Sequence, residues 1–420
     1  MNPIVLREGL ANSPGFEQQS RRGLPCLSGL RFFGALVVVL VHFGPISFLP
    51  RIFFWFGCQA VSFFFILSGI VLAYSYRDAI ISRSIGWPAF FNRRLARIMP
   101  VHVATWLIAT VMHVWFGWIS TKVQHPILSW IAGLLCIQVY WPSPSFFGRW
   151  NPPAWSISCE LFFYALFPFV LPLLERCLRS ISSIIITMSG ICVLQVILYL
   201  CASGITFEIF QSGHSFLGYQ SYATMDSVAL SVFPPLRLGE FLVGMCIGLL
   251  SLRTEYVPMT PLKANLLLAI CLVGFVLLLH IPGLNPRATG IQLYLFVPFI
   301  ALTLVAIMSG ATVLTPLLQN RIAIFLGEIS YPLYLLHSMF TPGAHASIVE
   351  YVLRVVACIV SAVILYLFVD RPVRRLWRQV LRSRRPVVPN PSYAEAHGAT
   401  ISDLKSRDFD PIKHAEGGLS

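Results

Sequence analysis

Charged side chains are scarce in this sequence. They make up 11% of its 420 residues, whereas 56% of the residues are hydrophobic. An ordinary soluble domain carries about 25% charged residues, so this balance excludes a soluble globular enzyme. The apolar runs recur along nearly the whole chain, and we therefore expect one polytopic membrane domain.

Several signatures of other protein classes are also missing. The ten cysteines lie singly, with no C-x-x-C pair and no Cys/His grouping at metal-ligand spacing, so we expect neither a disulfide framework nor a metal site. The sequence has no G-x-x-x-x-G-K-[ST] loop, which argues against ATP-driven work. The run GHSFLG has Leu217 where a nucleophile elbow needs its second glycine.

Basic residues exceed acidic ones, by 30 Lys and Arg to 17 Asp and Glu. The excess is nearly all Arg and lies beside apolar runs, which is the positive-inside pattern of a protein in a lipid bilayer. Aromatic and basic residues do not alternate on a polar surface as a strand-binding groove requires. We therefore expect the basic residues to interact with the lipid bilayer and not with nucleic acid.

Ten apolar runs are long enough to cross a membrane as helices. They predict an all-α fold, a polytopic membrane helix bundle of about ten transmembrane helices. The runs lie near residues 27–45, 55–76, 98–119, 156–174, 183–203, 233–251, 264–281, 291–309, 322–341 and 347–370.

One further apolar stretch, Ile127 to Tyr140, is too short to cross and precedes a proline-rich turn. We expect a short re-entrant or interfacial segment there, because this choice places the later basic loops on one side of the membrane. The basic residues before the first run, and those between the second and third, then lie in the cytoplasm. The nearly charge-free segment Ala202 to Val232 falls outside.

This threading predicts three parts. Residues 1–24 form a cytoplasmic N-terminal segment, residues 25–378 form the transmembrane domain, and residues 379–420 form a disordered cytoplasmic tail, rich in proline and mixed charge. The first twenty residues are unlike a cleavable signal peptide. We expect a multi-pass protein of a bacterial inner membrane with both termini in the cytoplasm.

Ionisable residues at membrane depth are costly and are functional candidates by default. The first helix carries Arg31 and His42, which are 11 residues apart and so share one face about three turns apart. A histidine whose pKa lies near neutrality can take a proton from a hydroxyl and return it. His42 is thus the candidate catalytic base with Arg31 on the same helix face, although a buried histidine can also be a packing residue.

An arginine cluster opens the third helix in the run FNRRLARIMP. Arg94 and Arg97 are three residues apart on one face, with Arg93 beside them. Guanidinium groups bind phosphate through two parallel hydrogen bonds, so these arginines are candidates for a polyanion at the inner membrane surface. For Arg93 a membrane anchor is a sufficient explanation.

The run NPPAWSISCELFFYALFP opens another helix and carries Trp155, Ser158 and Glu160. Glu160 lies in an apolar helix, and it needs a partner, either His42 or an intramembrane arginine. Ser68, in FFFILSGIV of the second helix, is a further candidate for ligand contact, although small residues there mostly serve packing.

Three other groups of polar residues lie in apolar helices, and for the first of them a structural and a functional interpretation stay equally open. Arg237 and Glu240 are spaced for mutual neutralisation at i, i+3. The run GEISYPLYLLH contributes Glu328, Tyr331 and His337, and Asp370 sits next to Arg371 at the end of the last helix.

Taken together and in this order, these segments resemble the acyltransferase-3 family of integral membrane O-acyltransferases, from about Pro25 to Arg375. The opening helix with Arg and His eleven apart is similar to that of the family, as are FF-x-x-SG, R-x-x-R, W-S-x-x-x-E and the last two helices. Departures are Ser28, where many members have Asp or Asn, and Leu161, where a second carboxylate or Gln often stands.

The resemblance implies an enzyme that moves an acyl group, most often acetyl, from cytoplasmic acyl-CoA to a hydroxyl. The acceptor is a sugar, an exported polysaccharide, or a glycosylated or macrolide-like small molecule. His42 would be the catalytic histidine with Arg31 and Glu160 as partners, and Arg94 and Arg97, with Arg93, would face the donor. Trp155, Ser158 and Ser68 would line the acceptor. Acyl-CoA is a co-substrate, and no permanently bound cofactor is implied.

Two questions stay open at the level of sequence. A general-base histidine and a histidine that carries the acyl group look alike. A glycan transporter or flippase without acyl transfer would also place His, Arg and Glu inside a bundle, and a non-catalytic assembly partner is a third alternative.

Overall fold

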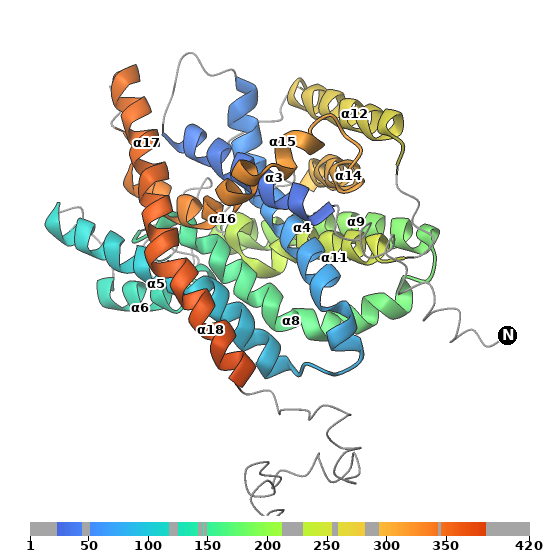
Figure 1. Cartoon of the computed structure of the whole chain (residues 1–420), viewed down its shortest axis with the longest axis horizontal. Helices are drawn as coiled ribbons and strands as arrows, with labels where there is room; N and C mark the ends of the chain where they lie inside the picture. The colour runs from blue at the N-terminus through green and yellow to red at the C-terminus, as the bar shows by residue number, and fades with distance from the viewer. Residues whose placement is uncertain are drawn as a thin grey trace, which may run out of the picture. The chain divides into compact units, whose positions relative to one another are not determined.

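The computed structural model describes residues 23–43, 51–116, 125–141, 146, 149–211, 230–253, 259–281, 294–342 and 346–383. The chain divides into two units, Met1–Arg371 and Pro372–Ser420. Throughout the described residues the regular structure is helical, which confirms the all-α fold. The first unit carries the bundle (Figure 1), and the described part of the second is the remainder of its last helix.

The first half of the bundle contains five long helices, with one short helix and two helical turns between the third and the fourth of them. Its elements are α3 (Gly23–His42), α4 (Arg51–Ile81), α5 (Trp87–Trp115), α6 (Pro126–Leu134), η1 (Gln138–Tyr140), η2 (Pro152–Ala154), α8 (Trp155–Cys177) and α9 (Ile181–Gln211).

The second half has shorter helices. Its elements are η4 (Pro234–Arg237), α11 (Leu238–Ser251), α12 (Pro261–Leu279), α14 (Val297–Met308), α15 (Thr315–Gln319), α16 (Arg321–Leu336), η5 (His337–Met339), α17 (Ile348–Leu365), η6 (Tyr366–Asp370) and α18 (Arg371–Ser383).

The predicted spans correspond to these helices. Within the described residues, nine helices are long and apolar enough to cross a membrane, and the shorter apolar helix Val297–Met308 matches the tenth run. The chain is therefore a multi-pass membrane protein. Residues 1–22 and 384–420 lie outside the described residues, as do residues 212–229 of the expected external segment. Helix α18 continues to Ser383, so residues 379–383 of the predicted tail are helical.

The main difference from the sequence prediction is the start of α5, eleven residues before the expected Ile98. Gly86 takes an extended conformation before the helix, and Pro88 occupies its first turn, where a missing N–H costs nothing. The arginine cluster therefore lies inside α5, two turns from its start.

The stretch Ile127 to Tyr140 does not cross the membrane. Its helix α6 has nine residues, about half the length that a crossing needs. Two ion pairs support this threading of the chain through the membrane. Arg77 near the end of α4 pairs with Glu175 near the end of α8, and Arg253 after α11 pairs with the same carboxylate. If residues 127–140 crossed, α4 and α8 would end on opposite sides.

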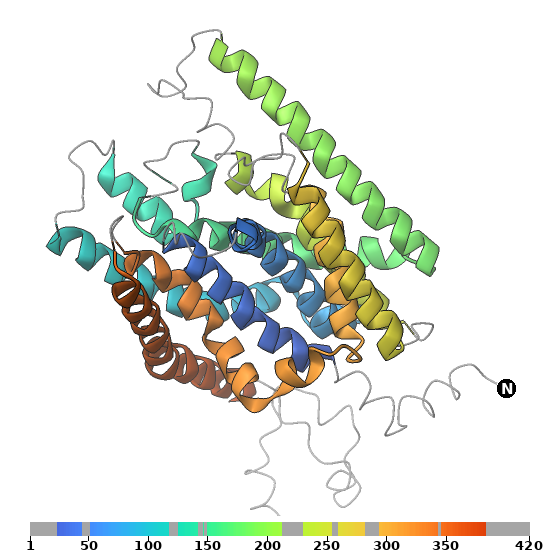
Figure 2. The same ribbon diagram turned by 90° about the horizontal axis from the view of Figure 1, so that it is seen from above.

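Close packing of α4 against α11 forms the centre of the bundle. Gly69 and Gly244 allow the contact, since a Cβ on Gly69 would lie 2.1 Å from the carbonyl oxygen of Phe241, and one on Gly244 would lie 2.0 Å from that of Ile66. Small residues let membrane helices approach this closely. Helix α3 packs on α4 and α16, whereas α9 lies at the edge (Figure 2). Accordingly, 72% of the α11 span is buried, against 17% of the α9 span.

We predict that Gly244→Ala destabilises the protein by about 1 to 3 kcal/mol, because the added methyl group overlaps backbone that cannot turn aside. Thermal unfolding of the detergent-solubilised protein measures this. Gly190→Ala is the matched control, since a Cβ there meets no atom within 4 Å. An unchanged midpoint for Gly244→Ala would contradict the close contact of α4 with α11.

Candidate active site

His42 is the last residue of α3, and one continuous helix therefore carries both Arg31 and His42. The side chain of His42 is exposed. Its Nδ1 lies 2.9 Å from the carbonyl oxygen of Val38. A carbonyl oxygen can only accept, so Nδ1 carries the proton and the lone pair is on Nε2. The imidazole is thus held in the tautomer whose outer nitrogen can accept a proton.

A second histidine lies against His42. The ring of His337 is 4.9 Å away between centroids, in an edge-to-face arrangement at 60°. It is buried, and its Nδ1 lies 2.6 Å from the carbonyl oxygen of Tyr334. The sequence identifies the segment that carries His337, but nothing in its spacing shows that the end of α16 meets the end of α3.

Glu160 finds its partners among tyrosine and arginine side chains. The hydroxyl of Tyr164, one turn later in α8, donates to its Oε2 at 2.7 Å. Arg94, Arg31 and Arg97 interact with the carboxylate electrostatically, and Arg31 also interacts with Glu328. The sequence predicted either His42 or an intramembrane arginine as the partner of Glu160, and the structure gives it arginines.

Arg94 differs from its expected position at the inner surface. It is buried, with its guanidinium carbon 5.0 Å from the ring centre of Tyr164 and 5.9 Å from that of Tyr76. The early start of α5 places it between α4 and α8, where these rings cover it. Arg93 and Arg97 are only partly buried, so of the three Arg94 is the one enclosed by protein.

The three residues expected to line the acceptor lie in different surroundings. Ser68 is buried and hydrogen-bonded to Tyr164, which favours the structural interpretation. The hydroxyl of Ser158 donates to Oε1 of Gln138 at 3.0 Å. Trp155 is partly buried, with Phe65 and Arg237 against its ring.

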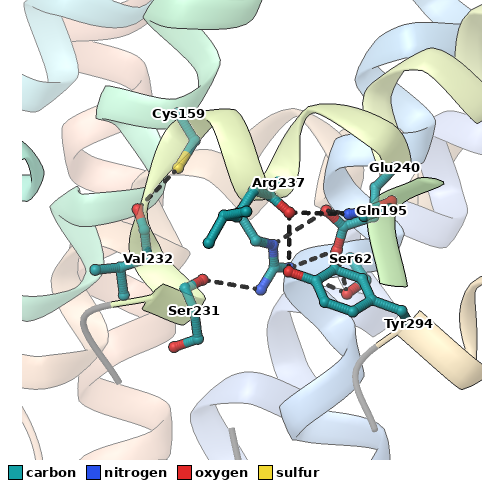
Figure 3. Close-up of polar contacts among 9 residues, drawn as sticks. Ser62, Cys159, Gln195, Ser231, Val232, Arg237, Glu240 and Tyr294 are labelled. Carbon is teal, nitrogen blue, oxygen red and sulfur yellow. Dashed lines mark hydrogen bonds and ion pairs between the residues drawn. The ribbon is translucent and has the colours of Figure 1, made fainter. Parts of the chain in front are cut away.

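Arg237 and Glu240 form the expected ion pair, with Nη2 and Oε1 2.8 Å apart and side chains 2% and 0% exposed. Figure 3 shows the surrounding network. Ser62 from α4 donates to Oε1 at 2.9 Å, and Gln195 from α9 donates to Oε2 at 3.3 Å. The Arg237 guanidinium also donates to the carbonyl oxygen of Ser231. The pair thus joins α4, α9 and α11 with its charges satisfied.

Cys136 is the only thiol for which the structure gives a histidine partner among the described residues. Its sulfur lies 3.2 Å from Nε2 of His102, but burial raises the pKa of the Cys136 thiol to about 12. Only a thiolate is an effective nucleophile, so this pair does not provide one. No group of three or more His, Cys, Asp or Glu that could hold a metal ion occurs in the described part of the chain.

The sequence profile of the acyltransferase-3 family, described as an acyltransferase domain, matches residues 24–370. The chain belongs to the acyltransferase-3 family. It is therefore an acyltransferase, and this assignment replaces the transporter and assembly-partner alternatives.

Curated members of the family extend the match over most of the chain. Acyltransferase MdmB of Streptomyces mycarofaciens is 30% identical over 416 residues, which cover 89% of this chain and 97% of MdmB. A protein of Staphylococcus aureus strain MRSA252, named as a predicted O-acetyltransferase, is 22% identical over 402 residues. This chain spans 61% of that longer protein. No solved structure matches the chain.

We predict that Arg237→Met destabilises the protein by about 3 to 5 kcal/mol, because it leaves the Glu240 carboxylate buried without its counter-charge. The double variant Arg237→Met with Glu240→Met regains much of this loss, since it removes both charges. Thermal unfolding of the single and double variants measures the difference. Equal unfolding midpoints for the single and the double variant would contradict the pairing of two buried charges.

Proposed function

We propose that this acyltransferase transfers an acetyl group from acetyl-CoA to a hydroxyl of a sugar, of an exported polysaccharide, or of a glycosylated or macrolide-like small molecule. The observation that carries the proposal is His42, whose Nδ1 is held by the Val38 carbonyl so that Nε2 is free to accept a proton. Two relatives, one named as an acyltransferase and one as an O-acetyltransferase, agree with this chemistry.

The proposed reaction joins the acceptor hydroxyl to the acyl carbon. Nε2 of His42 accepts the hydroxyl proton as the oxygen attacks the thioester carbonyl, and the tetrahedral intermediate then collapses. The C–S bond breaks, the CoA thiolate leaves and takes the proton from the imidazolium, and the acyl ester remains on the acceptor. An acyl-histidine route would use the same nitrogen as nucleophile.

We assign Arg31 to the donor side of this reaction. It lies 11 residues before His42 on α3, a rise of ~16 Å along the helix axis, and it interacts with Glu160 and Glu328. At that separation its guanidinium group does not reach an oxyanion formed beside His42. Together with Glu160 and Arg94 it forms a charged cluster between the helices.

Arg97 and Arg93 are the proposed contacts for the phosphates of acyl-CoA. Both are partly buried, so their guanidinium groups combine access to water with attachment to the bundle. Bidentate hydrogen bonds from arginine suit phosphate oxygens. Trp155 and Ser158 at the start of α8 lie on the proposed acceptor side.

We predict that His42→Ala lowers acyl transfer by about 10² to 10⁴ fold, because general-base catalysis contributes that much. Release of free thiol from acetyl-CoA by the purified protein measures the rate. His280→Ala is the matched control, since His280 ends α12 with the same contact between Nδ1 and a carbonyl oxygen, that of Val276, at 2.8 Å. A His42→Ala protein that is folded and retains most of its activity would contradict the proposal.

We also predict that Arg97→Ala weakens the binding of acetyl-CoA by about tenfold, through loss of a charge-assisted hydrogen bond. Isothermal titration with acetyl-CoA measures the dissociation constant. Arg179→Ala, at an exposed arginine after α8, is the control and keeps the affinity of the unmodified protein. Equal affinities for both variants would remove Arg97 from the donor site.

A further inference from the structure

A cavity of about 370 Å³ is lined by side chains of four helices, α3, α4, α12 and α14. Its volume falls at the lower end of the range of about 300–1,000 Å³ that is typical of ligand pockets. Its described lining residues are apolar apart from Gln59 of α4 and Thr303 of α14. The hydroxyl of Thr303 is hydrogen-bonded to Cys271. Gln59 is 5% exposed, and its Oε1 has no partner among the residues that the structure describes.

This cavity is separate from the candidate active site. The residues of α3 that line it, between Leu30 and Val37, recur at the spacing of one helix face. Arg31 and His42 share another face of the same helix, and neither is among the lining residues. A molecule bound in the cavity therefore does not occupy the place of the reacting groups.

The cavity opens toward the hydrocarbon of the bilayer. Leu272 and Leu314 line it and are 53% and 38% exposed, so it reaches the surface of the protein. Leu272 belongs to α12, whose span is only 17% buried and whose other exposed residues include Ile270 and Val273. In a multi-pass membrane protein, lipid chains surround such an apolar face. Since an apolar cavity does not hold water, a hydrocarbon chain is the molecule that fits it.

Gln59 lies toward the end of α3 in this cavity. A Cβ on Gly34 would lie 2.9 Å from the ring of Phe63, and one on Gly57 would lie 2.6 Å from the side chain of Val41. Helices α3 and α4 are therefore antiparallel, and Gln59 is level with the last turns of α3. The end of a spanning helix lies near a membrane surface, where the polar part of a lipid also lies. An amide oxygen in apolar surroundings is costly without a donor, and a lipid hydroxyl provides one.

We propose that this cavity binds a single-chain lipid that carries a hydroxyl group, of the monoacylglycerol type. The hydrocarbon chain packs against the apolar walls, and the hydroxyl donates to Oε1 of Gln59. The cavity is small for a ligand pocket, which favours one chain over the two chains of a phospholipid. The bound lipid fills the space between α3 and α4 on one side and α12 and α14 on the other. This site adds lipid binding to acyl transfer and does not depend on the proposed function.

Native mass spectrometry of the full chain in detergent tests the site with two probes, 1-monoolein and methyl oleate. Both carry the same chain, but only 1-monoolein has hydroxyl groups. The unmodified protein is expected to bind 1-monoolein about fivefold more tightly, as one hydrogen bond predicts. Gln59→Met keeps the side-chain size and is expected to abolish this preference. Because Gln59→Met removes an unpaired polar group, we expect it to fold.

A second pair of variants tests whether the cavity is the place of binding. Leu272→Trp puts a large ring at the opening and is expected to weaken the binding of both probes roughly tenfold through steric overlap. Val273→Trp is the matched control, because Val273 is the next residue of α12, is 57% exposed and is not among the lining residues. It is expected to bind both probes as the unmodified protein does.

Three results would overturn the proposal. Equal affinity of the unmodified protein for the two probes, or a preference that survives in Gln59→Met, would contradict the hydroxyl contact. Equal affinities of Leu272→Trp and Val273→Trp would contradict the cavity as the site. A co-purified two-chain phospholipid that is lost from Leu272→Trp and retained by Val273→Trp would contradict the single-chain ligand.

Discussion

A charge inside a membrane bundle must find its counter-charge within the protein, because hydrocarbon provides none. Two clusters in this chain meet that requirement. Arg237 and Glu240 neutralise each other, with Ser62 and Gln195 donating to the carboxylate, and Glu160 interacts with Arg31, Arg94 and Arg97. Each cluster joins helices that are far apart in the sequence, so the pairing of charges also determines which helices pack together.

The two clusters differ in their access to water. The Arg237 cluster is closed, and its guanidinium group supports the ring of Trp155 at the start of α8. The Glu160 cluster is open at Arg97, which keeps partial access to water. His42 and His337 lie against each other at the end of α3.

Local features of the site were predictable from the sequence, and contacts between distant segments were not. The spans, the ion pair at i, i+3 and the shared helix of Arg31 and His42 follow from periodicity alone. The buried position of Arg94 depended on where Gly86 and Pro88 start α5. The contact of His337 with His42 and the serine partner of Gln138 depend on tertiary packing, which periodicity does not encode.

Labelling with diethyl pyrocarbonate, which modifies unprotonated imidazole nitrogens, tests most directly whether His42 is accessible and adjacent to the donor. Peptide mass spectrometry of the full chain would report the rate at each histidine. The account predicts fast modification of the exposed His42, slow modification of the buried His337, and protection of His42 by acetyl-CoA. An unreactive His42, or one whose labelling acetyl-CoA leaves unchanged, would contradict the central role of this imidazole.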